Sequence, residues 1–281
     1  MSFVTRFAPS PTGQLHLGHA YSALLAYDMA QTASGRFLLR IEDTDAARCT
    51  AEFEQQIYDD LAWLGLSWET PVLRQSDNTA TYETAITRLG DMGLLYPCSC
   101  TRGDIRRALS APQEGVPSHG PDGLIYPGTC RGRHWHDRSA TDAVRLDMAK
   151  AIRRFKSLPQ YTETGIHPAL RLTRAHLIND VGDVVLARRD TKTAAYHLSV
   201  VVDDAAQNVT HVIRGADLAT ATPIHVLLQA LLGASIPIYH HHRLIRDADG
   251  KRLAKRDDAR AIALYRSEGA SPQDIKTMVG L

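Results

Sequence analysis

The stretch Arg6–His19 reads R-F-A-P-S-P-T-G-Q-L-H-L-G-H and joins an expected strand to an expected helix. Before its loop, Phe3–Phe7 alternates apolar and polar residues, as a β-strand does. From about Gly18 onward, apolar residues recur at helical spacing, and Phe37–Ile41 has the composition of a second strand. This order of strand, loop, helix and strand is typical of a parallel sheet with a ligand site at the carboxyl ends of its strands.

The rest of the chain continues this alternation around one irregular region. The pattern predicts helices over Ala51–Leu64, Thr79–Met92 and Ile224–Leu232, strands over Ala143–Leu146, Val209–Arg214 and Tyr239–Ile245, and a helix start at Ser271-Pro272. Between Tyr96 and Arg138 the sequence is rich in Gly, Pro, Cys and His and has weak periodicity. We therefore expect an insertion there that is held by something other than a hydrophobic core.

The composition is that of an ordinary globular protein. The chain has 281 residues, of which 44% are hydrophobic and 22% charged, with a formal net charge of +1. A balance so close to neutral means that any RNA would be bound through a local basic patch. No apolar run has the length of a membrane span, and Met1–Arg6 has no signal-peptide core, so we expect a cytosolic protein with no membrane partner.

The run H-L-G-H at residues 16–19 has the chemistry of a phosphate site. The N-terminus of a helix offers unpaired N–H groups and the positive end of the helix dipole to an anion. Gly18 permits a close approach of a nucleotide to the backbone, and His16 and His19 lie one turn apart, so both can face ATP. The alternative is a pair of surface histidines. The G-x-G-x-x-G and P-loop patterns are both absent.

The whole run Arg6–His19 resembles the first signature of class I aminoacyl-tRNA synthetases, in the form found in glutamyl-tRNA synthetases. The run Gly250–Arg256, G-K-R-L-A-K-R, resembles the second signature, a mobile lysine loop, but has Arg252 and Ala254 where lysine and serine are usual. The resemblance extends over roughly residues 4–260. It implies a set of ATP-binding residues, Pro9, His16, Gly18, His19 and Lys255, of which His16, His19 and Lys255 are implied to be catalytic.

The acidic run I-E-D-T-D, Ile41–Asp45, ends the second expected strand. A carboxylate there can hold the α-ammonium group of an amino acid, and the resemblance assigns this role to Glu42. A glutamate substrate also needs a cation for its side chain, and arginine supplies one with bidentate geometry. The glutamate-binding residues that the resemblance implies are Arg6, Ala8, Ser10, Glu42, Tyr196 and Arg214.

Three of the four cysteines gather in the irregular region. Cys98 and Cys100 form C-S-C, and Cys130 ends Y-P-G-T-C. In a reducing cytosol such a group suggests a structural zinc ion, which prefers four tetrahedral ligands. Chemistry alone leaves the fourth ligand open among nearby histidines, namely His119, His134 and His136. The resemblance to glutamyl synthetases implies Tyr126 instead, with His134 as its rival; Cys49 is expected to be a free thiol.

The chain ends at Leu281, soon after the lysine loop, where full glutamyl-tRNA synthetases continue into anticodon-binding domains. In this it resembles the short, free-standing glutamyl-queuosine tRNA(Asp) synthetases. That resemblance implies activation of L-glutamate by ATP without tRNA, with Mg²⁺ on the triphosphate, and transfer to the queuosine base in the anticodon loop of tRNA(Asp). No obligate protein partner is expected. Three alternatives remain: a truncated synthetase that charges a tRNA 3′ end, a nucleotidyltransferase, and an RNA-binding module with a dead active site.

The predicted fold is α/β, with a Rossmann-like parallel sheet of the class I synthetase type, a zinc-containing insertion and a short helical C-terminal segment. We expect four parts: residues 1–95, the first half of the nucleotide-binding catalytic domain; residues 96–180, the insertion and acceptor-facing subdomain; residues 181–258, the second half; and residues 259–281, the C-terminal helices.

Overall fold

The computed structural model describes residues 2–109, 119–166, 168–189, 193–246 and 260–281. The lysine loop, with Arg252, Ala254 and Lys255, lies outside these ranges.

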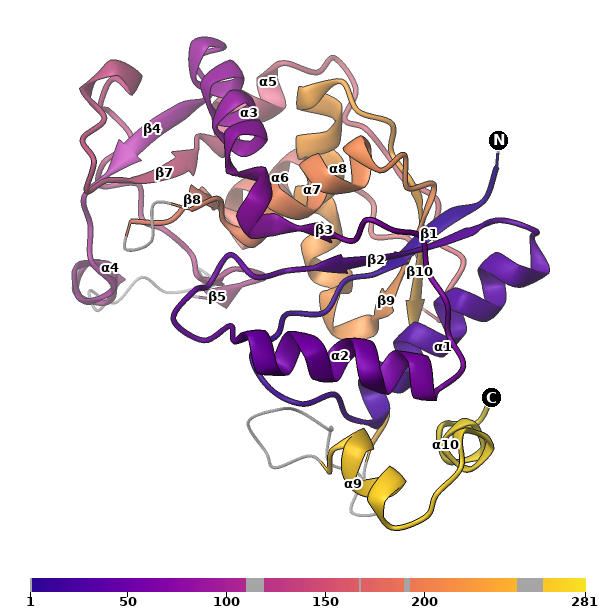
Figure 1. Cartoon of the computed structure of the whole chain (residues 1–281). Helices are drawn as coiled ribbons and strands as arrows, with labels where there is room; N and C mark the ends of the chain where they lie inside the picture. The colour runs from indigo at the N-terminus through magenta and orange to yellow at the C-terminus, as the bar shows by residue number, and fades with distance from the viewer. Residues whose placement is uncertain (1, 110–118, 167, 190–192, 247–259) are drawn as a thin grey trace.

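A parallel sheet forms the centre of the molecule (Figure 1). Its strands are β1 (Val4–Phe7), β2 (Arg36–Ile41), β3 (Leu73–Arg74), β9 (His211–Gly215) and β10 (Ile238–His242). β1 pairs with β2, β2 with β3, and β9 with β10, all in parallel. Thr210, just before β9, donates its N–H to the Val4 carbonyl of β1 over 2.9 Å. The two sets of strands therefore lie side by side, with β9 next to β1.

Two β–α–β units meet at the junction of β1 and β9. Helix α1 (Leu17–Thr32) joins β1 to β2, and the short helix η4 (Ala216–Ala221) with α8 (Thr222–Leu232) joins β9 to β10. Parallel strands present their carboxyl ends at one edge, and ligands bind in the crevice where the strand order reverses. The expected strand, loop, helix and strand unit over the first forty or so residues is confirmed.

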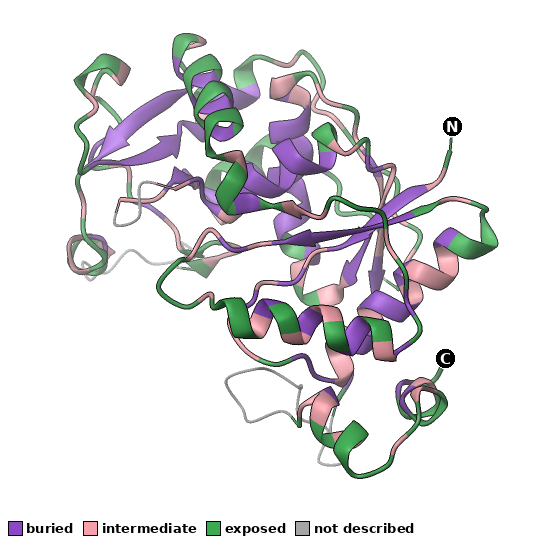
Figure 2. Cartoon of the chain, viewed as in Figure 1, coloured by how far each residue is buried: buried purple, intermediate pink, exposed green. Residues whose placement is uncertain are grey.

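Helices cover the sheet and bury most of its side chains (Figure 2). These helices are α2 (Ala51–Trp63), α3 (Thr79–Asp91) and α7 (Tyr196–Ala206) together with α1 and α8. The apolar run 198–202 lies within α7, which is buried over nearly its whole circumference, as an apolar helix must be. Two buried carboxylates on this helix depart from that pattern. Asp204 accepts hydrogen bonds from Arg6 of β1 and Arg40 of β2, whereas Asp203 accepts them from Gln75, Asn78 and Tyr82.

The irregular region carries more regular structure than its sequence predicts. β4 (Leu95–Cys98), β7 (Ala143–Leu146) and β8 (Val185–Ala187) form an antiparallel sheet, and β5 (His119–Gly120) pairs with β6 (Gly123–Leu124). Helix α4 (Arg102–Leu109) had no visible periodicity because only Ile105 on it is buried. A small apolar cluster, which includes Tyr96, Cys98 and Tyr126, forms a core of its own.

The C-terminal segment forms α9 (Ile262–Ser267) and α10 (Pro272–Val279), and α10 packs against α1 (Figure 1). The predicted helix start is confirmed: Ser271 caps α10 and accepts the N–H of Asp274. The remaining short elements are η1 (Gln75–Asn78), η2 (Trp135–Asp137), α5 (Met148–Arg153), α6 (Arg174–His176) and η3 (Leu177–Val181). Within the described ranges, none of the helices has both the length and the apolarity that a bilayer span requires.

Candidate active site

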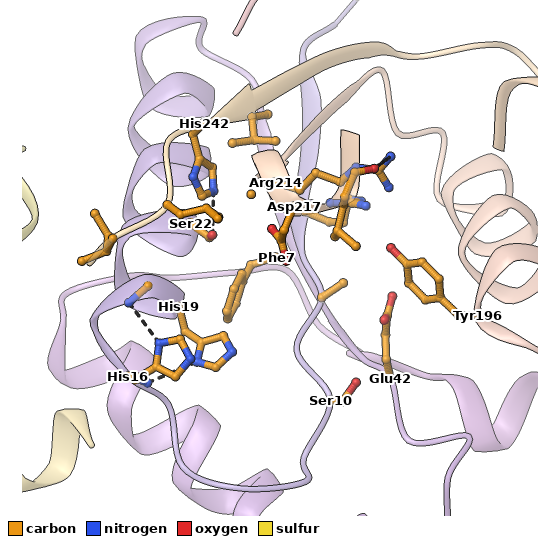
Figure 3. A pocket seen from close by; sticks show the side chains of 18 residues that line it. Phe7, Ser10, His16, His19, Ser22, Glu42, Tyr196, Arg214, Asp217 and His242 are labelled. Atoms are coloured by element: carbon orange, nitrogen blue, oxygen red, sulfur yellow. Dashed lines mark hydrogen bonds between the residues drawn. The ribbon is translucent and has the colours of Figure 1, made fainter. Parts of the chain in front are cut away.

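A cavity of about 510 Å³ opens at the carboxyl ends of β1, β2, β9 and β10 (Figure 3). It brings together most of the residues named from the sequence: Arg6, Ala8, Ser10, His16, Gly18, His19, Glu42, Tyr196 and Arg214. Pro9 does not line it; the Pro9 carbonyl accepts the N–H of Glu42 over 3.0 Å and so fixes the end of β2 against the loop. Lys255 lies outside the described residues.

The two histidines form the N-terminal cap of α1. The His16 Nδ1 accepts the N–H of Gly18 over 3.1 Å, and the His19 Nδ1 accepts the N–H of His16 over 3.2 Å. Their rings lie 3.8 Å apart between centroids. Because each Nδ1 is an acceptor, the proton of each neutral ring sits on Nε2, which makes Nε2 the donor toward a phosphate. The cap therefore presents two N–H donors at a helix N-terminus.

Gly18 allows this cap to form. A Cβ at Gly18 would lie 3.0 Å from the His16 Cε1 and 3.1 Å from its Nδ1, so the ring would have to move. Gly18→Ala is expected to raise the KM for ATP about tenfold, the worth of one hydrogen bond. Its melting temperature should not fall, because alanine favours the helix. Thr32→Ala, at the exposed far end of α1, is the control; an equal KM in both variants would contradict this role for Gly18.

A buried ion network lies behind the opposite wall of the cavity. Asp204 of α7 accepts the Arg6 Nε over 2.9 Å and the Arg40 Nη1 over 2.7 Å. Arg40 is fully buried, and its Nη2 donates to the Glu42 Oε1 over 3.3 Å. Burial raises the pKa of Glu42, and Arg40 and Arg6 only partly offset this. An ammonium group beside Glu42 would restore the charged carboxylate.

Arg214 differs from the other two arginines in having neutral partners. Its Nε donates to the His241 Nε2 and its Nη1 to the His225 Nδ1, both over 3.1 Å. Its Nη2 donates to the hydroxyl of Thr222 over 2.8 Å and to the carbonyl of Leu218 over 3.3 Å. Among the described residues no carboxylate forms an ion pair with this guanidinium, which is 5% exposed. A buried cation of this kind is a site for the carboxylate of a ligand.

Figure 3 shows how the cavity is divided. His16 and His19 lie at one side, and Tyr196 and Glu42 lie at the other, with Arg214 above and between the two groups in this view. Burial raises the pKa of Tyr196, so its hydroxyl stays protonated and available as a donor. One side thus suits an anionic phosphate chain, and the other suits a small zwitterion that carries a further carboxylate.

The three clustered cysteines come together in the insertion. The Sγ atoms of Cys98, Cys100 and Cys130 all lie within 4.8 Å of one another. The hydroxyl of Tyr126 lies 3.4 Å from the Cys98 sulfur and 3.3 Å from the Cys100 sulfur. A tetrahedral zinc ion with Zn–S bonds of about 2.3 Å requires sulfur atoms roughly this far apart. The cluster could hold a metal ion.

None of the rival histidines belongs to that cluster, as far as the described residues extend. His134 instead caps η2, where its Nδ1 accepts the N–H of His136 over 3.4 Å. Cys49 lies elsewhere and forms no disulfide.

Arg145 is a neighbour of the cysteine cluster that the sequence analysis missed. Its guanidinium lies 3.9 Å from the centroid of the Tyr126 ring, and its Nε donates to the Cys98 sulfur over 3.4 Å. A cation here stabilises negative charge on the cluster. The signal was present in the sequence, because an arginine within the buried strand A-V-R-L needs a partner.

Four further residues of the amino-acid side were also missed: Asp204, His225, His241 and Glu163. The pair D-D on an apolar helix and the run H-H-H at the end of β10 were visible signals. Neither signal identifies its partner, because each contact joins segments far apart in the chain.

Comparison with protein families gives one match over nearly the whole chain. Residues 2–281 match the model described as tRNA synthetases class I (E and Q), catalytic domain. A glutamyl-Q tRNA(Asp) synthetase of Rhodobacter capsulatus is 57% identical over 288 residues, covering 99% of this chain and 100% of that relative. A glutamyl-Q tRNA(Asp) synthetase of Nocardia farcinica is 43% identical, covering 98% of this chain and 82% of that relative.

Solved structures share the fold. A glutamate tRNA ligase from Elizabethkingia meningosepticum, in complex with its amino acid, superposes with a TM-score of 0.74 at 24% identity. The superposition covers the whole of this chain and 61% of that one. A methionyl-tRNA synthetase from Mycobacterium tuberculosis gives a TM-score of 0.63 at 9% identity. At these identities the likeness concerns the fold alone.

Proposed function

Since the chain belongs to the family of glutamyl-Q tRNA(Asp) synthetases, within the class I synthetases for glutamate and glutamine, we propose that it activates L-glutamate with ATP and transfers it to the queuosine base of tRNA(Asp). The class I fold with its parallel sheet is confirmed, and the chain is a ligase of the synthetase type. The solved relatives are longer, since the chain spans 61% of the first of them.

The observation that carries the proposal is that Arg214 lines the same cavity as Glu42 and Tyr196, while its hydrogen-bond partners are neutral groups outside the ion network of Glu42. A free glutamate has one ammonium group and two carboxylates. The cavity offers a carboxylate, a tyrosine hydroxyl and a buried cation that forms no ion pair within the part of the chain that the structure describes. In this assignment Glu42 receives the α-ammonium group and Arg214 the side-chain carboxylate. Glutamine is disfavoured because its neutral amide, although its oxygen can accept an N–H, would leave the buried charge of Arg214 uncompensated.

Four of the N–H groups of Arg214 already donate hydrogen bonds within the protein. In this assignment Arg214 therefore does not bind the substrate carboxylate through two parallel hydrogen bonds, the geometry that the sequence suggested. The guanidinium supplies its charge and the Nη1 N–H that these bonds leave over. Arg6 acts differently, since Asp204 compensates its charge. We assign Arg6 to fixing the wall of the cavity beside Tyr196.

The reaction needs no protein nucleophile. An oxygen of the glutamate α-carboxylate attacks the α-phosphorus of ATP, the bond to the bridging oxygen breaks, and pyrophosphate leaves with both electrons of that bond. The caps at His16 and His19 donate hydrogen bonds to the phosphate oxygens and stabilise the developing charge. Lys255 is assigned to the leaving pyrophosphate by resemblance alone. Mg²⁺ bound to the triphosphate would neutralise part of its charge.

In the second step, a hydroxyl of the queuosine cyclopentenediol attacks the carbonyl of the mixed anhydride. The ester forms, AMP leaves, and the hydroxyl proton passes to solvent or to the phosphate of AMP. The assignment of queuosine as the acceptor rests on the two relatives that are 57% and 43% identical to this chain. Because ATP and tRNA meet in the cytosol, the proposal locates the enzyme there.

We assign a structural zinc ion to Cys98, Cys100, Cys130 and Tyr126. The donor set supports this, since three sulfur atoms and one phenol oxygen converge and Cys130 also donates its N–H to that oxygen over 2.9 Å. The ion would tie the strand β4 to the segment after β6 and thereby hold a region that has only a small core. It takes no part in the chemical step.

Transfer of labelled glutamate to tRNA(Asp) tests the acceptor. Queuosine-containing tRNA(Asp) should accept about one glutamate per molecule, and the same tRNA without queuosine should accept none. Mild periodate treatment, which cleaves the diol, should abolish the acceptance. Equal transfer to both tRNAs would instead indicate charging of the 3′ end, and the base-directed assignment would be wrong.

A further inference from the structure

Glu163 lies behind Arg214, out of contact with the cavity. Its Oε2 is 2.5 Å from the Nδ1 of His241, and its Oε1 accepts the N–H of His241 over 2.9 Å and that of Gly165 over 2.7 Å. The side chains of Glu163 and His241 are each 1% exposed. Burial alone would raise the pKa of Glu163, but these hydrogen bonds hold that pKa below its usual value. Glu163 therefore remains a carboxylate.

The backbone fixes this carboxylate in place. The segment 162–166 runs beside β10, with the Thr164 N–H bonded to the Tyr239 carbonyl and the Ile166 N–H bonded to the His241 carbonyl, both over 2.9 Å. A Cβ at Gly165 would lie 2.2 Å from the His241 carbonyl oxygen, so only glycine permits this approach. Glu163 is thus held against one residue of β10.

We propose that Glu163 is a positioning residue that selects the tautomer of His241 and so keeps the charge of Arg214 available for the carboxylate of the amino acid. The carboxylate accepts from the Nδ1 of His241, which leaves the Nε2 unprotonated as the acceptor for the Arg214 Nε. This inference rests on the proposed function, because it takes glutamate as the substrate whose carboxylate Arg214 receives.

The interposed imidazole matters for specificity. A carboxylate in direct contact with Arg214 would neutralise it and compete with the substrate, whereas a neutral ring orients the guanidinium without supplying a counter-charge. A second neutral ring, His225, acts in the same way: burial and the nearby Arg214 lower its pKa well below the usual value. Its Nε2 lies 3.0 Å from the Nδ1 of His197. The arrangement thereby favours an acid over its amide.

Glu163→Gln would invert the tautomer with almost no change in shape. The amide oxygen keeps the two backbone hydrogen bonds, which directs the amide Nε2 as a donor toward the His241 Nδ1. The proton of the His241 ring then moves to the Nε2 of that ring, where it faces the Nε–H of Arg214. Two donors cannot share that contact, so Arg214 is displaced.

Nitrogen-15 NMR of the histidine rings of the wild-type protein tests the tautomer directly, with the signal of His241 identified by its loss in His241→Gln. The expected result is a neutral ring with its proton on Nδ1 and, in Glu163→Gln, with its proton on Nε2. A wild-type ring protonated on Nε2, or on both nitrogens at neutral pH, would overturn the proposal. This readout depends on no enzyme activity, so it decides the matter even where Glu163→Gln does not fold or the substrate differs.

Glutamate-dependent pyrophosphate exchange measures the consequence. Glu163→Gln should raise the KM for glutamate about 30-fold, leave the KM for ATP unchanged, and lower the preference for glutamate over glutamine. Glu83→Gln, which removes an exposed carboxylate of α3, is the matched control. A parallel change in both KM values, or an unchanged glutamate KM with an inverted tautomer, would refute the positioning role. Absence of exchange in the wild type would refute the proposed function and leave the tautomer result standing.

Discussion

Arg214→Gln is expected to lower kcat/KM for glutamate about 100- to 1,000-fold, with little change in the KM for ATP. A buried charge pair contributes about 3–4 kcal/mol, and about 1.4 kcal/mol corresponds to a tenfold change. Among the described residues Arg214 has hydrogen bonds to neutral groups only, so its charge is the part of the site that the substrate completes. For glutamine, which has no side-chain charge, kcat/KM should fall much less in this variant.

Pyrophosphate exchange at varied glutamate and varied ATP separates the two effects. Arg36→Gln is the control, since Arg36 begins β2 on the surface and pairs with Glu69. Thermal unfolding shows whether the four hydrogen bonds of Arg214 also stabilise the fold. A glutamate KM that stays within twofold of the wild-type value in a folded Arg214→Gln protein would show that the carboxylate binds elsewhere.

Cys98→Ala is expected to reduce bound zinc from about one ion per chain to nearly none, because a structural zinc ion loses most of its affinity with one thiolate. Since the proposed ion would join β4 to the segment around Cys130, its loss should release amide protection around residues 96–109 and 119–131. Metal analysis by mass spectrometry and hydrogen exchange of the purified protein measure both effects. The catalytic sheet, which has its own large cores, should keep its protection.

Three variants assign the fourth ligand. Tyr126→Phe should lower zinc affinity, whereas His134→Ala and Cys49→Ala should retain the ion. His134 is occupied in capping η2, and Cys49 lies outside the cysteine cluster. Full zinc retention by Cys98→Ala, or zinc loss by His134→Ala, would show that the ligand assignment is wrong.

Much of the site followed from the sequence because it is local. The run Arg6–His19 specifies a strand, a tight loop and a helix cap within one short segment, and all the residues that make the cap lie within it. The helix start at Ser271 was predictable for the same reason. By contrast, α4 was not, because a helix that buries only Ile105 lacks an apolar stripe.

The residues that lie behind Arg214 could not be predicted from the sequence. Glu163 and His241 are far apart in sequence, and their contact depends on the segment 162–166 lying along β10. A glutamate two residues before a glycine and a histidine in a run of three have no distinctive pattern by themselves. Only the folded chain brings Glu163 against His241 and His241 against Arg214. The four domain ranges and the role of Lys255 stay predictions.

Exchange of labelled pyrophosphate into ATP, with purified protein, L-glutamate and no tRNA, measures whether this cavity activates glutamate. The proposed function predicts exchange with glutamate, and a much lower rate with glutamine, aspartate and every other amino acid of a full panel. Exchange with glutamate that requires tRNA would indicate an ordinary synthetase of the same family. No exchange with any amino acid would contradict the claim that this cavity activates glutamate.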